Sequence, residues 1–382
     1  MTGTKYPRIH LTMDNCFAMK RWIRPSDWAR VIREDIGGIS CVQASTDLEI
    51  DPQFCPRDYT QRWIEEVQKC ESKYGLRLVS LYSGYVTYRS ASLLNWDKSY
   101  RERFLNTYVY GTIDLAQTMN AVAGGTLQAF TDEVLQDPDR FTQAEGMLTD
   151  YSVRCAEYAA NKGVLYGFEQ MYTPTQGWWR IKDVKRYMRD VYRISGKPLY
   201  MTIDTAHMAG QGLFYIPSDE EMSVMAAAHS TKGRRLPDEM RVMVENGTSP
   251  ADLKKVAQHY EYWFSDHGDE DVYRWLEEVS CYSPIMHLQQ TDGSYSAHRP
   301  FTDRFNKTGI ITPERVLRSI VKCYDQPADE SMPPRAEDIY LAFEIFFGIT
   351  DSKEDIISAL KETVAYWRDV IRLDGKTADE WL

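Results

Sequence analysis

Short runs of apolar, β-branched and aromatic residues recur along the chain, and longer stretches with a helical spacing of apolar positions separate them. Near-continuous apolar runs of this kind are typical of strands buried on both faces of a parallel sheet. The pattern predicts eight strands: RIHLTMD (8–14), ISCVQAS (39–45), LRLVSLYSG (76–84), GTLQAF (125–130), VLYGFEQMY (164–172), LYMTIDTAHM (199–208), IMHLQQTD (285–292) and IYLAFEIFF (339–347).

Eight strands that alternate with helices favour a closed barrel over an open doubly wound sheet, and no GxGxxG motif follows the first strand. We therefore predict an α/β fold, a (β/α)8 TIM barrel that forms a single domain over residues 1–382. A βα unit of such a barrel has about 31 residues, and the stretch from His207 to His287 is more than twice that length. Its polar, Gly- and Pro-punctuated sequence predicts a helical insertion between strands six and seven, at about 210–260, outside the barrel wall.

Charge and composition restrict the partners. A net charge of −11, with acidic and basic residues mixed, argues against nucleic acid or an anionic membrane surface. No stretch approaches the roughly 18 apolar residues of a membrane helix, and the first residues lack the pattern of a signal peptide. Seven scattered cysteines without a CxxC motif fit a reducing compartment. We expect a cytoplasmic homo-oligomer whose partner is a small molecule.

Four strands in the second half carry an ionisable or imidazole side chain near the C-terminal end. These are Glu169 in GFEQ, Asp204 in TIDTAH, His287 in IMHLQQ and Glu344 in LAFEIF. Barrel enzymes place their chemistry at the C-terminal ends of the strands, and neighbouring strands lie about 4.8 Å apart. Since an isolated buried carboxylate is very costly, the four residues predict one divalent metal site. Three carboxylates and one imidazole favour Mn²⁺, with Mg²⁺ or Co²⁺ as alternatives.

The same residues suggest a reaction. Moving a proton next to a carbonyl requires stabilisation of an enediolate, which a metal bound to two vicinal sugar oxygens provides. Glu169 and Glu344 come from strands three apart, so they can face each other across a small sugar as an acid/base pair. A metal site with two facing glutamates suits a sugar epimerase and a 1,2 aldose–ketose isomerase equally. A lyase, either a dehydratase or a decarboxylase of a keto-sugar acid, would use the same enediolate.

Basic residues in two loops are candidates for substrate binding. Lys20 and Arg21 closely follow the first strand and could hold a phosphate or a carboxylate. His298 and Arg299 lie in HRPF, in a loop after strand seven that should overhang the site. A metal-dependent phosphodiester nuclease would need a basic face and several metals, and the acidic chain with seven histidines argues against it.

The order Glu, Asp-x-x-His, His, Glu on strands five to eight resembles the xylose-isomerase-like superfamily of sugar-phosphate isomerases and epimerases. The ketose 3-epimerase branch is the most similar in motif layout, and the resemblance extends over about 8–347. The chain departs from that branch at two positions. Gly293 occupies the position at which the branch has a substrate-binding Arg, and Gln43 occupies a position at which the branch commonly has a Glu.

The resemblance implies a metal-dependent isomerase or epimerase of a small ketose or ketose phosphate that works through a cis-enediolate. It implies that His207 in DTAH hydrogen-bonds a substrate oxygen and that Glu169 and Glu344 transfer protons. It further implies that the metal ligands are Glu169, Asp204, His287 and Glu344.

Overall fold

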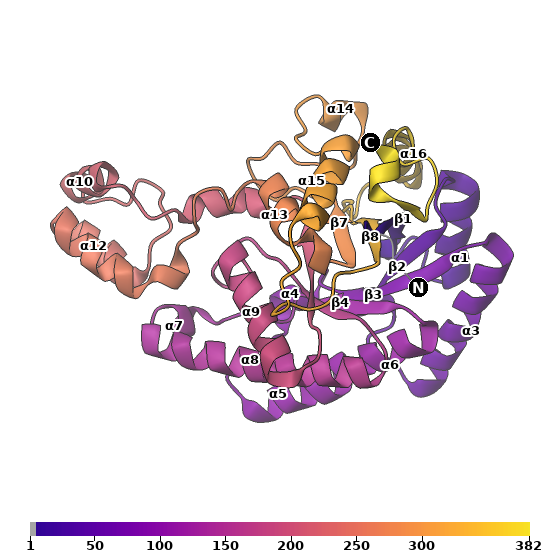
Figure 1. Cartoon of the computed structure of the whole chain (residues 1–382), viewed down its shortest axis with the longest axis horizontal. Coiled ribbons are helices and arrows are strands. Elements are labelled where there is room, and N and C mark those ends of the chain that lie inside the picture. The colour runs from indigo at the N-terminus through magenta and orange to yellow at the C-terminus, as the bar shows by residue number, and fades with distance from the viewer. Residues whose placement is uncertain (1–4) are drawn as a thin grey trace.

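The computed structural model describes residues 5–382 and shows a closed barrel of parallel strands surrounded by helices (Figure 1). Each strand pairs with the next one in the chain, and the last pairs with the first. The predicted TIM barrel is therefore confirmed. The barrel strands are β1 (Arg8–Asp14), β2 (Cys41–Ser45), β3 (Arg77–Ser83), β4 (Val122–Gly125), β5 (Tyr166–Glu169), β6 (Tyr200–Asp204), β7 (Ile285–Leu288) and β8 (Asp338–Phe343).

The helices follow the strands in the alternation that the apolar spacing predicts. A two-residue strand near the C-terminus, β9 (Lys376–Thr377), was not predicted and pairs antiparallel with β1. The helices are α1 (Pro25–Arg30), α2 (Thr46–Glu49), α3 (Arg57–Tyr74), α4 (Thr87–Ser90), α5 (Lys98–Phe104), α6 (Tyr110–Met119), α7 (Asp132–Leu135), α8 (Pro138–Asn161), α9 (Ile181–Ser195), α10 (Asp219–Ala228), α11 (Asp238–Glu245), α12 (Pro250–His259), α13 (Val272–Val279), α14 (Asp303–Asn306), α15 (Pro313–Asp325) and α16 (Lys353–Arg368). No helix within residues 5–382 is both long and apolar enough to cross a membrane.

The predicted fourth strand, 125–130, lies too far along the chain. The strand is Val122–Gly125, and the residues after Gly125 form the loop at its C-terminal end. Leu127 and Phe130 of that loop are buried, so the apolar pattern came from packing and not from barrel pairing. The side chains of Thr126 and Gln128 instead donate hydrogen bonds to Glu169.

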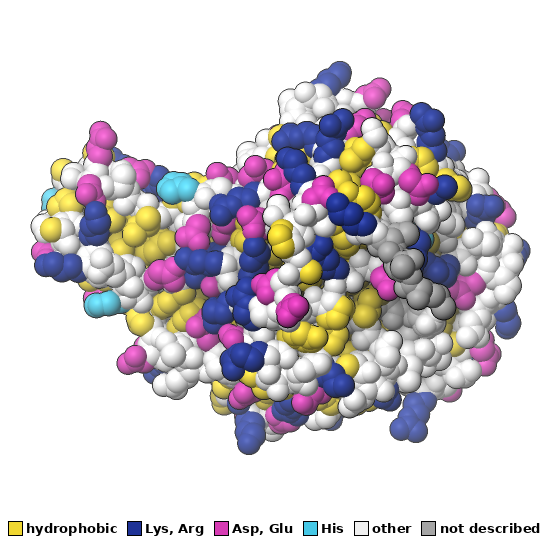
Figure 2. Space-filling view, in the orientation of Figure 1, with side chains coloured by type: hydrophobic (Ala, Val, Ile, Leu, Met, Phe, Trp, Pro, Cys, Tyr) yellow, Lys and Arg dark blue, Asp and Glu magenta, His cyan; other side chains and the backbone are white. Residues whose placement is uncertain are grey.

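The predicted insertion lies between β6 and β7 and is helical. Its helices α10, α11 and α12 project away from the barrel, at the left of Figure 1. Ser218 and Glu221 form a capping box at the start of α10, which satisfies backbone donors at that helix end. Acidic and basic side chains are interspersed over the face in Figure 2, so this face has no large patch of one sign.

The barrel wall offers a test of the packing. Leu341 of β8 is fully buried, and Leu373, near the C-terminus, is 59% exposed. We expect Leu341→Ala to lower the free energy of unfolding by about 2–5 kcal/mol, because it leaves a cavity in a packed interior. Leu373→Ala should change it by no more than about 0.5 kcal/mol. Denaturant unfolding of both variants measures the difference, and equal effects would contradict this placement of β8.

Candidate active site at the C-terminal rim

Strand register brings the four predicted metal ligands together. Asp204 and His287 are direct partners in the β6–β7 pairing, and Glu169 is the last residue of the neighbouring strand β5. Glu344 follows immediately after the end of β8. One potential ligand atom from each of the four residues lies within 4.8 Å of those of the other three. The barrel thus converts four separate sequence motifs into one buried cluster.

His287 lies between two of the carboxylates. Its Nδ1 is 2.8 Å from Glu169 Oε1 and 3.3 Å from Glu344 Oε2. Burial disfavours the imidazolium, but Glu344 and Glu169 outweigh burial and hold the pKa of His287 well above its usual value. Burial also disfavours the Glu344 carboxylate, whereas His287 and His298 outweigh it and lower the pKa of Glu344. His287 and the two glutamates are thus in direct electrostatic contact.

Asp204 is oriented by its surroundings. The backbone N–H groups of Ala206 and His207 donate to Asp204 Oδ1 at 2.7 and 3.1 Å. The side-chain amide of Gln289 donates to the other oxygen, Oδ2. Asp204 is fully buried, and burial raises the pKa of its carboxyl group. Both carboxylate oxygens are thus held in place where the other ligand atoms converge.

The cluster fits a hard divalent cation. Three carboxylates give it a formal charge of −3, and such a charge is very costly in the interior without a compensating cation. Oxygen ligands with one imidazole suit Mg²⁺, Mn²⁺ or Co²⁺ better than a thiolate-preferring ion.

Two further residues lie against this cluster: Asp14, which was missed from the sequence, and Gln43, which was noted only as a departure from the ketose 3-epimerase branch. Gln43 at β2 places its Nε2 3.0 Å from His287 Nε2 and also donates to Asp14, near the end of β1. Burial raises the pKa of Asp14 to about 6. Asp14 is the last residue of β1, whereas Gln43 lies in the middle of β2, so the strand-end criterion applied to these strands would have found Asp14 alone.

Gln43 holds the ring of a proposed metal ligand, which makes its removal informative. We expect Gln43→Leu to weaken divalent metal binding by roughly 10- to 100-fold, because partners of ligating histidines fix ring orientation. Calorimetric titration with Mn²⁺ measures the affinity, and thermal unfolding shows whether the variant is folded. Gln68→Leu, on the exposed side of α3, is the matched control. Wild-type affinity in folded Gln43→Leu would contradict this role.

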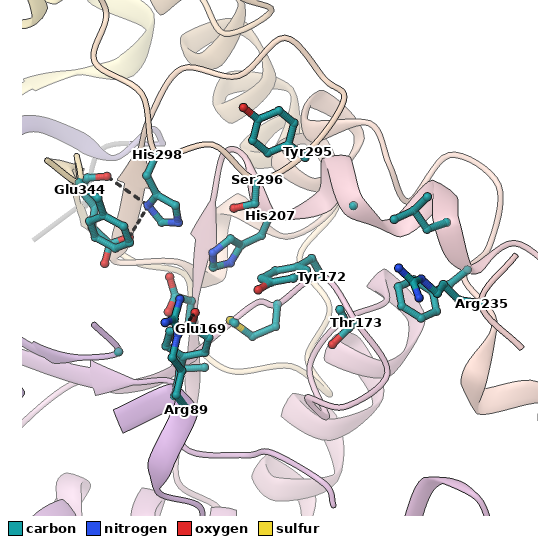
Figure 3. A pocket seen from close by; sticks show the side chains of 18 residues that line it. Arg89, Glu169, Tyr172, Thr173, His207, Arg235, Tyr295, Ser296, His298 and Glu344 are labelled. Atoms are coloured by element: carbon teal, nitrogen blue, oxygen red, sulfur yellow. Dashed lines mark hydrogen bonds and ion pairs between the residues drawn. The ribbon is translucent and has the colours of Figure 1, made fainter. Parts of the chain in front are cut away.

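A cavity of about 460 Å³ opens above the cluster, and both glutamates line it (Figure 3). His207 and His298 also line this cavity. A volume of this size lies within the roughly 300–1,000 Å³ typical of small-molecule sites. The two predicted acid/base residues are therefore open to a ligand.

The two cavity histidines are held in defined positions. His207 Nδ1 is 2.8 Å from the carbonyl oxygen of Gln170, and His207 Nε2 lies 3.5 Å from Asp204 Oδ2. The His298 ring stacks on Phe346 with centroids 4.0 Å apart, and its Nδ1 is 3.4 Å from Glu344 Oε2. His298 has a backbone φ of +42°, a left-handed value that is uncommon for a residue other than glycine. Asp204, His207 and His298 also form a second compact group of potential ligands.

The structure does not bring the other predicted substrate-binding residues to this cavity. Lys20 and Arg21 line a separate cavity, and the Arg21 guanidinium donates to the Ile349 carbonyl at 3.1 Å. Arg299 forms an ion pair with Asp292 at 3.1 Å and is not among the residues that line the cavity. His298 of the same loop lines the cavity, whereas the Arg299 backbone pairs with Gln290 and its side chain contacts Asp292.

Comparison with solved structures identifies the architecture. A crystal structure from Rhodospirillum rubrum, provisionally assigned as a xylose isomerase, aligns with a TM-score of 0.68 at 19% identity, over 94% of this chain and 99% of that one. The chain has the xylose-isomerase-like TIM-barrel fold. The structure of an L-ribulose 3-epimerase shares this fold, with a TM-score of 0.54 at 14% identity over 97% of this chain and 96% of that one.

Comparison with curated sequences adds a more local similarity. The chain is 28% identical to D-erythrulose 1-phosphate 3-epimerase of Brucella abortus (strain 2308) over 171 residues. That alignment covers 44% of this chain and 51% of the relative, so the chain spans about half the length of the relative it matches. No family model matches the chain.

Proposed function

We propose that the protein is a divalent-metal-dependent isomerase or epimerase of a small ketose or ketose phosphate. One observation carries the proposal: Glu169 and Glu344 belong to the buried ligand cluster and both line the cavity above it. The similarity to a ketose-phosphate 3-epimerase over part of the chain supports the same class of substrate. The xylose-isomerase-like fold supports the location of the site at this rim.

In this proposal the metal is held by Glu169, Asp204, His287 and Glu344. The donor set favours Mn²⁺, with Mg²⁺ or Co²⁺ as alternatives. When bound, the cation supplies Lewis-acid stabilisation of the negative charge that develops on the substrate oxygens. Asp204 and His287 do not line the cavity, so in this proposal they act only as metal ligands. Both glutamates line the cavity and therefore also contact the substrate.

Proton transfer falls to the two glutamates. One carboxylate removes the proton from the carbon next to the carbonyl, and the other returns a proton to the opposite face, which inverts that carbon. Thr126 donates a hydrogen bond to Glu169 Oε2, and His298 lies against Glu344 Oε2 at 3.4 Å, so each carboxylate has a partner that fixes its direction. A single shuttling carboxylate would instead perform a 1,2 aldose–ketose isomerisation.

The cavity histidines orient the substrate. Because His207 Nδ1 lies against the Gln170 carbonyl, that nitrogen carries the proton and leaves Nε2 to accept a hydrogen bond from a sugar hydroxyl. His298, fixed by its stacking on Phe346, is positioned to contact a second sugar oxygen. Lys20, Arg21 and Arg299, which were expected to bind the substrate, do not line the cavity. The similarity to a ketose-phosphate 3-epimerase over part of the chain favours the isomerase or epimerase over the lyase.

Product analysis tests the proposal. The metal-saturated protein should be incubated with C4 to C6 ketoses and their phosphates, and the products identified by NMR. We expect a C3 epimer or an aldose of the same mass as the substrate. A product that has lost water or CO₂ would establish the lyase, and no conversion of any of these compounds would reject the proposed substrate class.

A further inference from the structure

The cavity extends beyond the ligand cluster to the insertion. The residues that line its far side include Leu213 and Phe214, which follow β6, and Arg235, which lies between α10 and α11. Figure 3 shows Glu344 at one side of the cavity and Arg235 at the other, with Tyr172 and Thr173 between them. The insertion is therefore part of the wall of the active-site cavity.

Arg235 is an exposed residue whose backbone is held in place and whose side chain has no partner among residues 5–382. Leu236 and Pro237 are buried, and Trp263 Nε1 donates to the Arg235 carbonyl at 3.0 Å. The guanidinium makes no hydrogen bond or ion pair with any residue in the range 5–382. Its neighbour Arg234 differs, because it pairs with Glu221 inside the insertion. In Figure 3 the guanidinium of Arg235 lies on the side that faces Thr173.

The charges of the cavity are segregated. The ligand cluster carries three carboxylates and would remain at about −1 with a divalent cation bound. An anionic group on a substrate is repelled from that end and attracted to a guanidinium at the other. A planar guanidinium binds phosphate through two parallel hydrogen bonds, which makes an unpaired arginine a suitable anion partner.

A second arginine in the lining is less free to act in this way. Arg89, on α4, donates through Nε to Tyr88 Oη at 2.5 Å, and its guanidinium lies over the Tyr88 ring. Of the two cavity arginines, Arg235 is the one without a protein partner.

We propose that Arg235 binds the phosphate of a ketose phosphate, so that the insertion selects phosphorylated over unphosphorylated substrates. This inference rests on the proposed function, because it assigns the two ends of one substrate to the two ends of the cavity. The reacting carbons lie over Glu169 and Glu344, and the phosphate lies under the insertion. The insertion thus serves as a substrate-selecting element of the barrel.

The test is the ratio of kcat/KM for a ketose phosphate to kcat/KM for the same ketose without phosphate, at saturating metal. We expect Arg235→Ala to lower this ratio roughly 10- to 100-fold, the range for a lost charge-assisted hydrogen-bonded pair. Arg235→Lys should give an intermediate ratio, since it keeps the charge and loses the paired geometry. Arg234→Ala is the matched control: it breaks an ion pair in the same segment and should leave the ratio unchanged.

Four results would overturn the proposal. The first is an unchanged ratio in Arg235→Ala, and the second is an equal fall in Arg234→Ala, which would show a general loss of the insertion's structure. The third is a fall in Arg89→Ala without one in Arg235→Ala, which would assign the phosphate to Arg89. A wild-type preference for a ketose with a terminal carboxylate over the phosphate would likewise reject phosphate as the anion.

A binding measurement separates this inference from the proposed function. Calorimetric titration of the metal-loaded protein with inorganic phosphate and with a ketose phosphate requires no turnover. We expect binding of both to weaken in Arg235→Ala and to persist in Arg234→Ala. Arg235-dependent binding without conversion of any ketose would support the anion site and reject the proposed reaction. Turnover of a ketose phosphate whose binding does not depend on Arg235 would support the proposed reaction and reject the anion site.

Discussion

Glu169→Gln and Glu344→Gln should each reduce turnover on the order of 10²- to 10⁴-fold while the barrel stays folded. Glutamine keeps the size of the side chain and can still offer an oxygen to a metal, but it cannot accept a proton at neutral pH. The assay is kcat at saturating metal, because metal affinity is also expected to fall. Calorimetry of each variant confirms that the metal site is filled before rates are compared.

The two variants also distinguish the two reactions. If the protein is an epimerase, each variant should block exchange of the substrate proton with solvent on the face of the carbon that the replaced carboxylate contacts. If it is a 1,2-isomerase, only one of the two variants should block this exchange. Glu354→Gln, an exposed glutamate on α16, is the matched control and should keep full activity. Near-normal activity of both site variants would show that neither glutamate transfers the proton.

Removal of the metal should have an effect of similar size. Dialysis against a chelator is expected to lower turnover by on the order of 10³-fold or more, since Lewis-acid stabilisation contributes several kcal/mol to such a step. The protein should also unfold at a lower temperature without metal, because three buried carboxylates within 4.8 Å then repel one another. A metal at 100 times its Kd should add about 2.7 kcal/mol to the free energy of unfolding.

Readdition of Mn²⁺ should restore both activity and stability, and Asp204→Asn should weaken both responses. Differential scanning calorimetry with and without metal measures the stability change. Full activity and an unchanged melting temperature after chelation would contradict a metal site in this cluster.

The barrel and the ligand cluster could be predicted because both depend on local sequence features. A buried strand reads as an apolar run, and an ionisable residue at its end stands out against that run, as Glu344 does in LAFEIF. Closure of the barrel then brings Asp204 beside His287 without further information. The predicted position of the fourth strand was wrong because Leu127 and Phe130, in the loop after β4, are buried and as apolar as strand residues.

The residues around the substrate could not be predicted in the same way. Proximity to a strand end brought Lys20 and Arg21 into the predicted site, but the turn after β1 carries them to another cavity. Arg235 is far from any strand in the sequence, and it lines the cavity from the segment between α10 and α11. Such contacts depend on loop conformation, which neither composition nor periodicity encodes.

Solvent exchange tests the central claim most directly, namely that the metal cluster and its two glutamates move a proton next to a substrate carbonyl. The metal-loaded protein is incubated in D₂O with a ketose or ketose phosphate that it binds, and deuterium is located by NMR. We predict incorporation at the carbon next to the carbonyl, with no loss of water or CO₂, in wild-type protein and none after metal removal. A bound substrate that takes up no deuterium, or that takes it up equally without metal, would contradict the account.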